Sequence, residues 1–467
     1  MKTHVMPNLK VIVKDCLVGQ SFSLESLLWL QALIFSFLVL SCSTSEPEVS
    51  NEPIPDKVNV PPKNEDSNYF EGKEYQGEYG TVEILNSELI DNNFILVNDA
   101  GNNRVYLMDK KAQVRHEWPL SNNLGNDALL VPKGRLLVSL EADDTQIEFG
   151  GQGGKLQFMD KGGRILWNFD YSSENFQTHH DAILLPNGNV VALVWEKMTK
   201  EESVFAGSKL NVDLYPEAII EINPTTDEIV WEWHAWNHLV QDYDADQMNY
   251  GVIAENPQLI DLNYAPKENG DIMHANGIGY DAINDLIFVS VNFYHEIWVI
   301  DHSTTTQEAA DHSGGNRNQG GDLVYRFGNP MAYKNTSGER LFHNNHHPNV
   351  LTAEDQGNLL VFSNGNGLDP EQSTVFELKL PEPLGLFPDT DNEPTIVWSF
   401  TDKNLFSAKV SGAVKLPNGN RLITEGDYGL WEVTEDGEVI WKYSGDGFFW
   451  RAYNFNKDSP EIRALGL

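Results

Sequence analysis

The sequence predicts an all-β protein, a six-bladed β-propeller built from four-stranded antiparallel blades. Three observations in the 467 residues support this fold class. A strand motif with period-two alternation recurs along most of the chain, a tight hairpin motif precedes several of its copies, and helical patterns are nearly absent. A β-sandwich is the main alternative, but it does not predict a repeat of this length.

The strand motif consists of an aliphatic residue, any residue, an aromatic residue, any residue and a second aromatic residue. Several copies follow a turn sequence, as in TEDGEVIWKY and DKGGRILWNF. The copies are ILWNF at Ile165, IVWEW at Ile229, IVWSF at Ile396, VIWKY at Val439, the close variant LVYRF at Leu323 and the degenerate VRHEW at Val114. These six copies indicate six blades.

The hairpin motif places a tight turn between two apolar, alternating runs. Asn-Gly in that position is a strong signal for a two-residue hairpin. The copies are ILLPNGNVVALV at Ile183, AVKLPNGNRLIT at Ala413 and the looser ALLVPKGRLLVSL at Ala128. Together the motifs predict a unit of strand, hairpin, strand, strand, turn and strand, repeated six times over residues 77–460. Insertions such as residues 301–322 make the spacing uneven, and we expect them in loops on a propeller face.

The N-terminal segment predicts export. A short apolar run, Leu27–Leu40, follows three lysines and has the length of a signal-peptide core rather than of a membrane span. Val39, Leu40 and Ser41 before Cys42 resemble a bacterial lipobox, so residues 1–41 are predicted to be a lipoprotein signal peptide and Cys42 the lipidated residue. An uncleaved anchor would give the same compartment. We therefore expect a periplasmic or outer-membrane lipoprotein.

Residues 42–76 are rich in Ser, Pro, Asn and Glu and are predicted to be a disordered tether. The formal charge is 32 − 69 = −37, which argues against nucleic acid or an anionic membrane surface as a partner. Contact with a membrane is expected only through the lipid anchor. The chain has two cysteines, Cys16 and Cys42, so a cysteine-based zinc cluster is excluded from the propeller.

Histidines recur at one position of the repeat. When the blades are aligned on their first hairpins, THHDAIL, MHANGIG and NHHPNVL coincide at the start of the innermost strand in three successive blades. The corresponding stretches of the second and last blades, GNDALL and KVSGAV, lack histidine, which argues against a purely structural role. The histidines concerned are His179, His180, His274, His346 and His347.

Convergent imidazoles suit two kinds of chemistry. They could bind zinc or copper, or they could act in nucleophilic and general acid–base catalysis, since a neutral imidazole can attack an electrophile and be displaced again. The spacing does not separate these alternatives. No dedicated metal motif is present, DYDADQMNYG lacks the features of an EF-hand loop, and FGGQGGK does not follow the P-loop pattern and is interpreted as a turn.

The chain also contains longer motifs, namely HHDAILLPNGN, WHAWNHLVQDYD, MHANGIGYDAINDLIFVSVNFYHEIWVIDHSTTTQEAA, GGDLVYRFGNP and FFWRAYNF. These motifs resemble the bacterial arylsulfate sulfotransferase family. The resemblance implies a six-bladed propeller that moves a sulfuryl group from a phenolic sulfate ester to another phenol, through a transient sulfohistidine. It also implies that no nucleotide sulfate donor and no cofactor are needed, and that aryl sulfates and phenols are the small-molecule partners.

The resemblance also implies roles for the histidines. The family histidine of blade four falls on His274, and that of blade three on His179 or His180. The nucleophile falls on His346 or His347, with His346 slightly favoured. The other histidines would hydrogen-bond the sulfuryl oxygens or give a proton to the leaving phenolate.

One departure from the family concerns the sulfate oxygens. The family has an arginine before WVID, whereas the run here is SVNFYHEIWVID and Asn292 occupies that place. An arginine would bind sulfate oxygens as a cation, but asparagine offers only a neutral donor. Arg451 or His295 could compensate, although Arg451 could instead form a salt bridge in the closing blade. Asn276 and Asn349, in the histidine motifs, complete the predicted substrate-binding residues.

Aromatic residues near the channel mouth fit an aryl substrate. The candidates are Phe293, Tyr294, Phe448, Phe449 and Trp450. The segment before residue 77 leaves no room for the extra N-terminal β-domain that pairs subunits in some relatives, so the oligomeric state is unknown. Two other functions fit the residues: a metal-dependent hydrolase or lyase with the same histidines, and a catalytically silent ligand-binding propeller, for which Asn292 is the argument.

Overall fold

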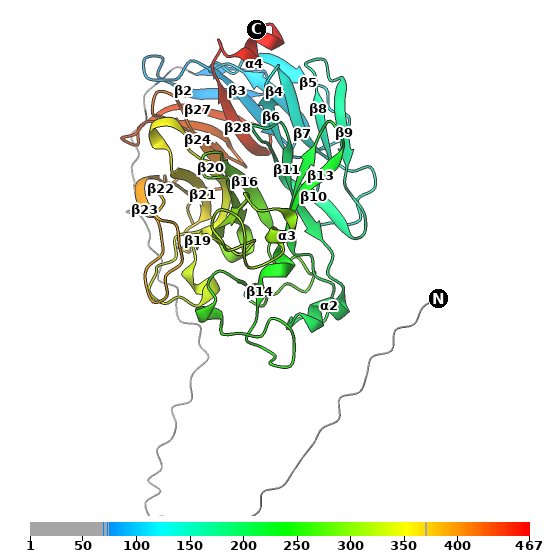
Figure 1. The fold of residues 1–467 in the computed structure, drawn as a ribbon. Coiled ribbons are helices and arrows are strands. Elements are labelled where there is room, and N and C mark those ends of the chain that lie inside the picture. The colour runs from blue at the N-terminus through cyan, green and yellow to red at the C-terminus, as the bar shows by residue number, and fades with distance from the viewer. Residues whose placement is uncertain (1–68, 70–71, 73, 369–370) are drawn as a thin grey trace, which may run out of the picture. The chain divides into compact units, whose positions relative to one another are not determined.

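Six four-stranded antiparallel blades follow one another around a ring in the computed structural model (Figure 1). The structure describes residues 69, 72, 74–368 and 371–467, which belong to one compact unit. The innermost strands of neighbouring blades contact each other around the ring. This confirms the predicted six-bladed propeller. The predicted signal peptide, Cys42 and most of the tether lie outside the described residues.

Each blade is numbered by its place in the ring. Blade one contains β28 (Phe449–Phe455), β3 (Phe94–Asp99), β4 (Arg104–Met108) and β5 (Val114–Trp118). Blade two contains β6 (Leu124–Val131), β7 (Arg135–Glu141), β8 (Gly154–Met159) and β9 (Ile165–Asp170). Blade three contains β10 (Phe176–Leu184), β11 (Val190–Glu196), β12 (Glu217–Asn223) and β13 (Glu228–His234).

The other three blades complete the ring. Blade four contains β16 (Ala275–Asp281), β17 (Leu286–Val291), β18 (Glu296–Asp301) and β19 (Tyr325–Phe327). Blade five contains β20 (His343–Val350), β21 (Asn358–Gly365), β22 (Thr374–Lys379) and β23 (Thr395–Phe400). Blade six contains β24 (Gly412–Lys415), β25 (Arg421–Glu425), β26 (Gly429–Val433) and β27 (Val439–Gly445).

Both ends of the described chain close the ring. The C-terminal strand β28 is the innermost strand of blade one and pairs with β3, so red and blue strands lie side by side in Figure 1. At the other end, β2 (Gly80–Leu85) pairs with β27 and extends blade six, and β1 (Tyr75–Gln76) pairs with β2. Tyr75 and Gln76 were expected in the tether, but their pairing with β2 places them in the sheet.

Hydrophobic clusters lie between the blades, one for every pair of neighbours. The aromatic residues of the strand motif contribute to them, as Trp231 does between blades three and four. Alternating strands bury one residue in two on each face, and a blade packed on both faces buries both sets. This explains why the inner and middle strands are apolar throughout.

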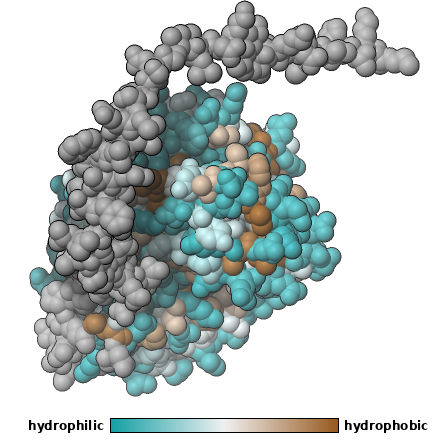
Figure 2. Space-filling view, turned by 90° about the horizontal axis from the view of Figure 1, so that it is seen from below, coloured by the Kyte–Doolittle hydropathy of each residue, from teal (hydrophilic) through white to brown (hydrophobic). Residues whose placement is uncertain are grey.

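Short elements occupy the connections. They are the parallel pair β14 (Leu239–Val240) and β15 (Ile260–Asp261), the helices α2 (Lys200–Phe205), α3 (Thr306–Ala309) and α4 (Pro460–Leu465), and the 3₁₀ turns η1 (Ala235–His238), η2 (Ile253–Glu255), η3 (Asn292–Tyr294), η4 (Pro330–Tyr333) and η5 (Ala353–Asp355). Among the described residues, the helices are too short or too polar to span a membrane. The surface seen in Figure 2 is mostly hydrophilic with smaller hydrophobic patches, in keeping with the net charge of −37.

Candidate active site

Three histidines occupy matching positions in, or directly before, the innermost strands of blades three, four and five. His180, His274 and His347 all have a left-handed backbone, with φ of 50°, 55° and 55°. Each lies in or directly before a β-bulge of its strand, and bulges re-aim side chains. A left-handed backbone costs a non-glycine residue about 1–2 kcal/mol, and such strain gathers at functional sites. The repeat alignment made from the sequence therefore corresponds to a repeated local geometry.

His180 and His274 lie next to each other across the boundary between blades three and four. Their ring centroids are 4.7 Å apart and the rings are nearly perpendicular. Nδ1 of His274 donates to Oδ2 of Asp271 over 2.5 Å, which orients the ring. Nε2 of His274 makes no hydrogen bond within the described residues, so it is left for a ligand.

A buried chain of hydrogen bonds runs from Glu217 to His180. Oε2 of Glu217 lies 2.8 Å from Nε2 of His179, and Nδ1 of His179 lies 2.8 Å from Nδ1 of His180. Oε1 of Glu217 accepts from the backbone N–H of Ala275 over 2.7 Å. Burial raises the pKa of Glu217 well above its usual range and lowers the pKa values of both histidines. Glu217 thus determines which nitrogen of His180 carries the proton.

Gly151 packs directly on His180. A Cβ atom built at Gly151 would lie 2.2 Å from Nε2 of His180, and the glycine has φ of +83°. Its carbonyl accepts from the backbone N–H of His180 over 2.9 Å. The FGGQGGK stretch was interpreted only as a turn, but it also forms a wall beside this imidazole. Glycine is required there for both conformation and space.

His346 is buried, and both of its ring nitrogens are engaged. Nδ1 donates to Oδ1 of Asn364 over 2.6 Å, and Nε2 accepts from the backbone N–H of Val410 over 3.2 Å. The Asn364 amide is oriented by its own Nδ2 bonds to the carbonyls of Ser407 and Val410. The proton of His346 is therefore on Nδ1 and the lone pair on Nε2. Burial lowers the pKa of His346 to about 3, so the imidazole is neutral near pH 7.

Val410 has an unusual backbone for its residue type. Its φ is 55°, and that of the following Ser411 is 84°. A β-branched residue in this region is a genuine outlier. The conformation presents the Val410 N–H to His346, so blade six contributes a backbone donor at the position where blades three to five have histidine.

His347 has different surroundings from His346. Its Nδ1 is buried without a hydrogen-bond partner in the described part of the chain, and its ring lies 6.1 Å from that of Tyr453. A Cβ at Gly412 would lie 2.4 Å from this nitrogen. Burial, followed by the Arg451 charge, lowers the pKa of His347 well below its usual range. His347 is therefore a neutral imidazole without a partner among the described residues.

Arg451 connects four blades from the innermost strand of blade one. Nη1 donates to Asp181 over 2.7 Å and to Asp127 over 3.2 Å, and Nη2 donates to the carbonyl of Asn276 over 2.8 Å. Tyr453 also donates to Asp127, whose pKa burial raises to about 6. The guanidinium is 2% exposed and its charge is balanced by two carboxylates. These contacts are those of the closing-blade salt bridge, and a substrate contact of Arg451 stays a prediction.

Asn292 and His295 lie in η3 and just after it. The backbone N–H of Asn292 donates to the carbonyl of His274 over 3.2 Å, which places the two residues side by side. The side-chain amide of Asn292 makes no hydrogen bond within the described residues. Nδ1 of His295 accepts from the backbone N–H of Asn344 over 3.0 Å, and burial lowers its pKa to about 2. His295 is therefore a neutral residue at the boundary with blade five.

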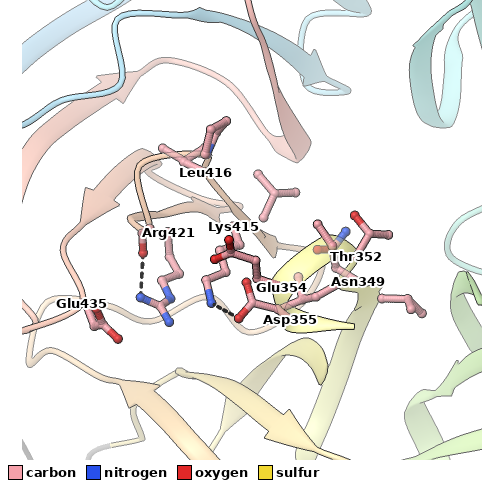
Figure 3. Close-up of a pocket in the computed structure, with 14 residues that line it drawn as sticks. Asn349, Thr352, Glu354, Asp355, Lys415, Leu416, Arg421 and Glu435 are labelled. Atoms are coloured by element: carbon pink, nitrogen blue, oxygen red, sulfur yellow. Dashed lines mark hydrogen bonds and ion pairs between the residues drawn. The ribbon is translucent and has the colours of Figure 1, made fainter. Parts of the chain in front are cut away.

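The two other predicted asparagines lie in different parts of the fold. Asn276 is fully buried and donates to the carbonyl of Asn345 over 2.9 Å, joining the inner strands of blades four and five. Asn349 lines a groove of about 760 Å³ formed by residues 349–355 and the β24–β25 hairpin. Figure 3 shows Asn349 in this groove with Lys415 and Arg421. The lining contains none of the five histidines.

The predicted aromatic residues divide into two groups. Phe293 stacks on His274 with centroids 4.8 Å apart, and Trp450 lies 5.7 Å from His180. Tyr294 and Phe449 are buried in the packing of the blades and are not at the site, contrary to expectation. Phe449 alternates with Trp450 along β28, which is why these adjacent aromatics point to opposite faces of the strand.

Two exposed lysines stand over aromatic rings near the histidines. Nζ of Lys267 lies 4.7 Å from the ring of Phe293, and Nζ of Lys409 lies 5.2 Å from that of Phe448. Phe293 in turn stacks on His274, and Lys409 directly precedes Val410. Neither cation was identified from the sequence. The two lysines provide positive charge near the site, which the neutral side chain of Asn292 cannot provide.

Glu217, Asp271 and Asn364 were also missed. Asp271 could have been noticed, because it lies three residues before His274, just ahead of the MHANGIG motif. Glu217 and Asn364 are 38 and 18 residues from the histidines they contact. Only the pairing of strands within each blade brings them together. Among the described residues, the one group of three potential metal ligands with atoms within 4.8 Å is His238, His312 and Asp322, outside this site.

The family comparison bears directly on this arrangement. A family model described as arylsulfotransferase (ASST) matches residues 81–447, which include every blade strand except β28. The chain belongs to the arylsulfotransferase family. Membership supports aryl sulfotransferase activity in general, with aryl sulfates and phenols as the substrate classes. A search of curated proteins found no match.

Solved structures of other proteins are similar at low identity. The putative 6-phosphogluconolactonase of Bacteroides fragilis is 10% identical, with 78% of this chain and 99% of that chain covered and a TM-score of 0.40. BamB of Moraxella catarrhalis is 10% identical, with coverages of 84% and 96% and a TM-score of 0.31. Kuenenia stuttgartiensis hydrazine synthase is 15% identical at a TM-score of 0.32; the match covers 59% of this chain and 65% of that chain.

Proposed function

We propose that this arylsulfotransferase-family protein transfers a sulfuryl group from a phenolic sulfate ester to a phenol through a sulfohistidine at His346. The observation that carries the proposal is the tautomer of His346. Asn364 holds the proton on Nδ1, which leaves a lone pair on Nε2, the arrangement that a neutral nitrogen nucleophile needs. The charges of Arg451 and His274 act on His346, and His346 acts on His180, so the three histidines lie in one electrostatic neighbourhood.

In the first half-reaction Nε2 of His346 attacks the sulfur. The N–S bond forms as the S–O bond to the aryl group breaks, and the leaving phenolate takes a proton from Nε2 of His274. Asp271 accepts from Nδ1 of His274 and so holds the ring in place for this transfer. In the second half-reaction the neutral His274 takes the proton of the acceptor phenol, whose oxygen attacks the sulfur. The N–S bond then breaks and His346 is regenerated.

Donors for the sulfuryl oxygens come from three neighbouring groups. The Val410 N–H, which lies 3.2 Å from Nε2 of His346, can transfer its hydrogen bond to a sulfuryl oxygen as the N–S bond forms. The Asn292 amide adjoins His274. A protonated Glu217 donates to His179, which donates to Nδ1 of His180, so His180 presents an Nε2–H donor. Lys267 and Lys409 attract the anionic ester electrostatically.

Release of p-nitrophenol from its sulfate ester, with and without phenol, tests the proposal. Wild-type protein should release p-nitrophenol faster when phenol is added and should do so in EDTA. Protein quenched without acceptor should carry one sulfuryl group, located by mass spectrometry on His346. The His346→Ala variant should lose labelling and release, whereas His347→Ala should keep the label. A sulfuryl group on His347 or His274 would contradict the assignment, and release without acceptor would indicate hydrolysis.

We also propose that the chain is an exported lipoprotein. The support is the apolar run Leu27–Leu40 and the lipobox-like residues before Cys42. Cells expressing the full chain with a labelled fatty acid should incorporate label, and Cys42→Ser should abolish it. Cys16→Ser is the matched control and should be labelled normally. Equal labelling of both variants would exclude Cys42 as the lipid site.

A further inference from the structure

The 301–322 insertion of blade four carries a second histidine cluster that the proposed reaction does not use. His312 and Asp322 belong to this insertion, and His238 ends η1 after blade three. Oδ1 of Asp322 lies 2.8 Å from Nδ1 of His238 and 2.7 Å from Nδ1 of His312. The three ligand atoms all lie within 4.8 Å of one another. One carboxylate oxygen therefore faces two imidazole nitrogens.

The second nitrogen of His238 has a fixed role. Nε2 lies 2.8 Å from the carbonyl oxygen of Ala309, which can only accept, so Nε2 carries a proton. In neutral His238 the lone pair is then on Nδ1 and points at a carboxylate oxygen that also only accepts. Two acceptors at 2.8 Å repel each other unless a positive charge lies between them. That charge is either a proton held between the two atoms or a cation.

The surroundings hold this geometry in place. The ring of Trp233 stacks on His238 with an interplanar angle of 4°, and its Nε1 donates to the carbonyl of Gly321 over 2.7 Å. His238 is fully buried and Asp322 is 5% exposed, whereas the His312 side chain is 59% exposed. Two ligands are thus fixed in the protein, and the third closes the cluster from the solvent side.

The geometry points to a zinc site formed by Nδ1 of His238, Nδ1 of His312 and a carboxylate oxygen of Asp322. Two imidazoles and one carboxylate suit Zn²⁺, with water as a fourth ligand on the exposed side. An N–H donated to a backbone carbonyl is the usual outer contact of a metal-binding histidine, and His238 already has it. Calcium needs about six to eight oxygen ligands, and this cluster is dominated by nitrogen.

Two of the three ligand-atom distances require only a small adjustment, and the third, between Nδ1 of His238 and Nδ1 of His312, is at most 4.8 Å. Tetrahedral zinc with bonds of about 2.0–2.1 Å separates its ligand atoms by about 3.3 Å. The two contacts of 2.7 Å and 2.8 Å would each open by about half an ångström. The metal would join the insertion to the segment after blade three, where Ala309 of α3 already contacts His238. The site is structural and is independent of the proposed sulfuryl transfer.

Zinc titration of the full protein, stripped with a chelator and dialysed, tests the site. Calorimetry should give one zinc per chain with a dissociation constant in the micromolar range or below, and zinc should raise the melting temperature by several degrees. His312→Ala should weaken binding by about 100-fold or more, and Asp322→Asn should weaken it as well. Because His312 is largely exposed, its replacement should leave the unliganded protein folded.

His302→Ala is the matched control. His302 also contacts two carboxylates, Glu221 and Asp285, but no second histidine. This variant should bind zinc as wild type does. A wild-type protein that binds no zinc, or a His312→Ala variant that binds it equally well, would overturn the proposal. Sulfuryl transfer measured in parallel should not depend on the added zinc.

Discussion

The Nδ1 atoms of His179 and His180 lie 2.8 Å apart, so two imidazoles adjacent in the sequence share one proton. The shared bond is possible because His180 adopts φ of 50°, which turns its ring toward that of its neighbour. His179 is held at its other nitrogen by Glu217 and stacks on Trp195 at 3.9 Å. The protonation of Glu217 therefore decides whether Nε2 of His180 donates or accepts a hydrogen bond.

Replacing Glu217 separates these two states. Glu217→Gln imitates the protonated acid, because an amide can donate to His179 and accept from Ala275, so activity should stay within a few-fold of wild type. Glu217→Ala removes the donor and should lower kcat by about 100-fold. Glu221 lies on the same strand but contacts His302, so Glu221→Gln is the control and should leave kcat unchanged. If Glu217→Gln were as inactive as Glu217→Ala, Glu217 would have to exchange its proton during turnover.

Gly151→Ala should displace His180. The added Cβ would meet the imidazole at 2.2 Å, and φ of +83° adds backbone strain. Gly188→Ala is the matched control, since Gly188 has φ of +92° and a Cβ atom added there would meet nothing within 4 Å. Both variants should lose about 1 kcal/mol of stability from the backbone. Only Gly151→Ala should also lose activity, by about tenfold or more; equal kinetics in the two variants would show that the contact is unimportant.

Lys267 and Lys409 should act on binding of the anionic ester rather than on the chemical step. The double variant Lys267→Met/Lys409→Met should raise KM for p-nitrophenyl sulfate by about three- to tenfold with little change in kcat, because the lysines attract the ester without touching the reacting bond. The effect should shrink at high salt. Lys379→Met, at the far end of a blade-five strand from His346, is the control. A fall in kcat at unchanged KM would place a lysine in the chemical step.

The fold and the histidine set could be predicted because both repeat. Period-two alternation and Asn-Gly turns act locally, so the strands of Ile165 and Ile183 were identifiable without knowing their partners. The closure of the ring could not be predicted in this way. It depends on β2 and β28, which join blades whose other strands lie more than three hundred residues away in the chain. Similarly, the contact of Glu217 with His179 depends on strand pairing across blade three.

Individual side chains were predicted less well than their strands. Asn349 lies two residues after His347, yet the bulge after His346 and the end of the strand carry it into a separate groove. Arg451 was assigned a substrate contact or a closing-blade salt bridge, and the two buried carboxylates that neutralise it come from blades two and three. The sequence alone did not indicate which aspartates would form ion pairs with Arg451.

His295 should make the protein less stable as the pH falls. Burial lowers its folded pKa to about 2, while an exposed histidine titrates near 6.5. Below about pH 6.5 the unfolded chain therefore binds a proton that the folded protein does not. The free energy of unfolding consequently decreases as the pH is lowered. His295→Asn removes this titration, and asparagine tolerates the left-handed φ of 57° and can still accept from the Asn344 N–H. Urea unfolding gives the free energy of unfolding at each pH. Between about pH 7.5 and about pH 5.5, wild type should lose about 1.4 kcal/mol more of this free energy than the variant. Equal losses in the two proteins would mean that His295 is protonated in the folded state, and that its contact with Asn344 is made differently.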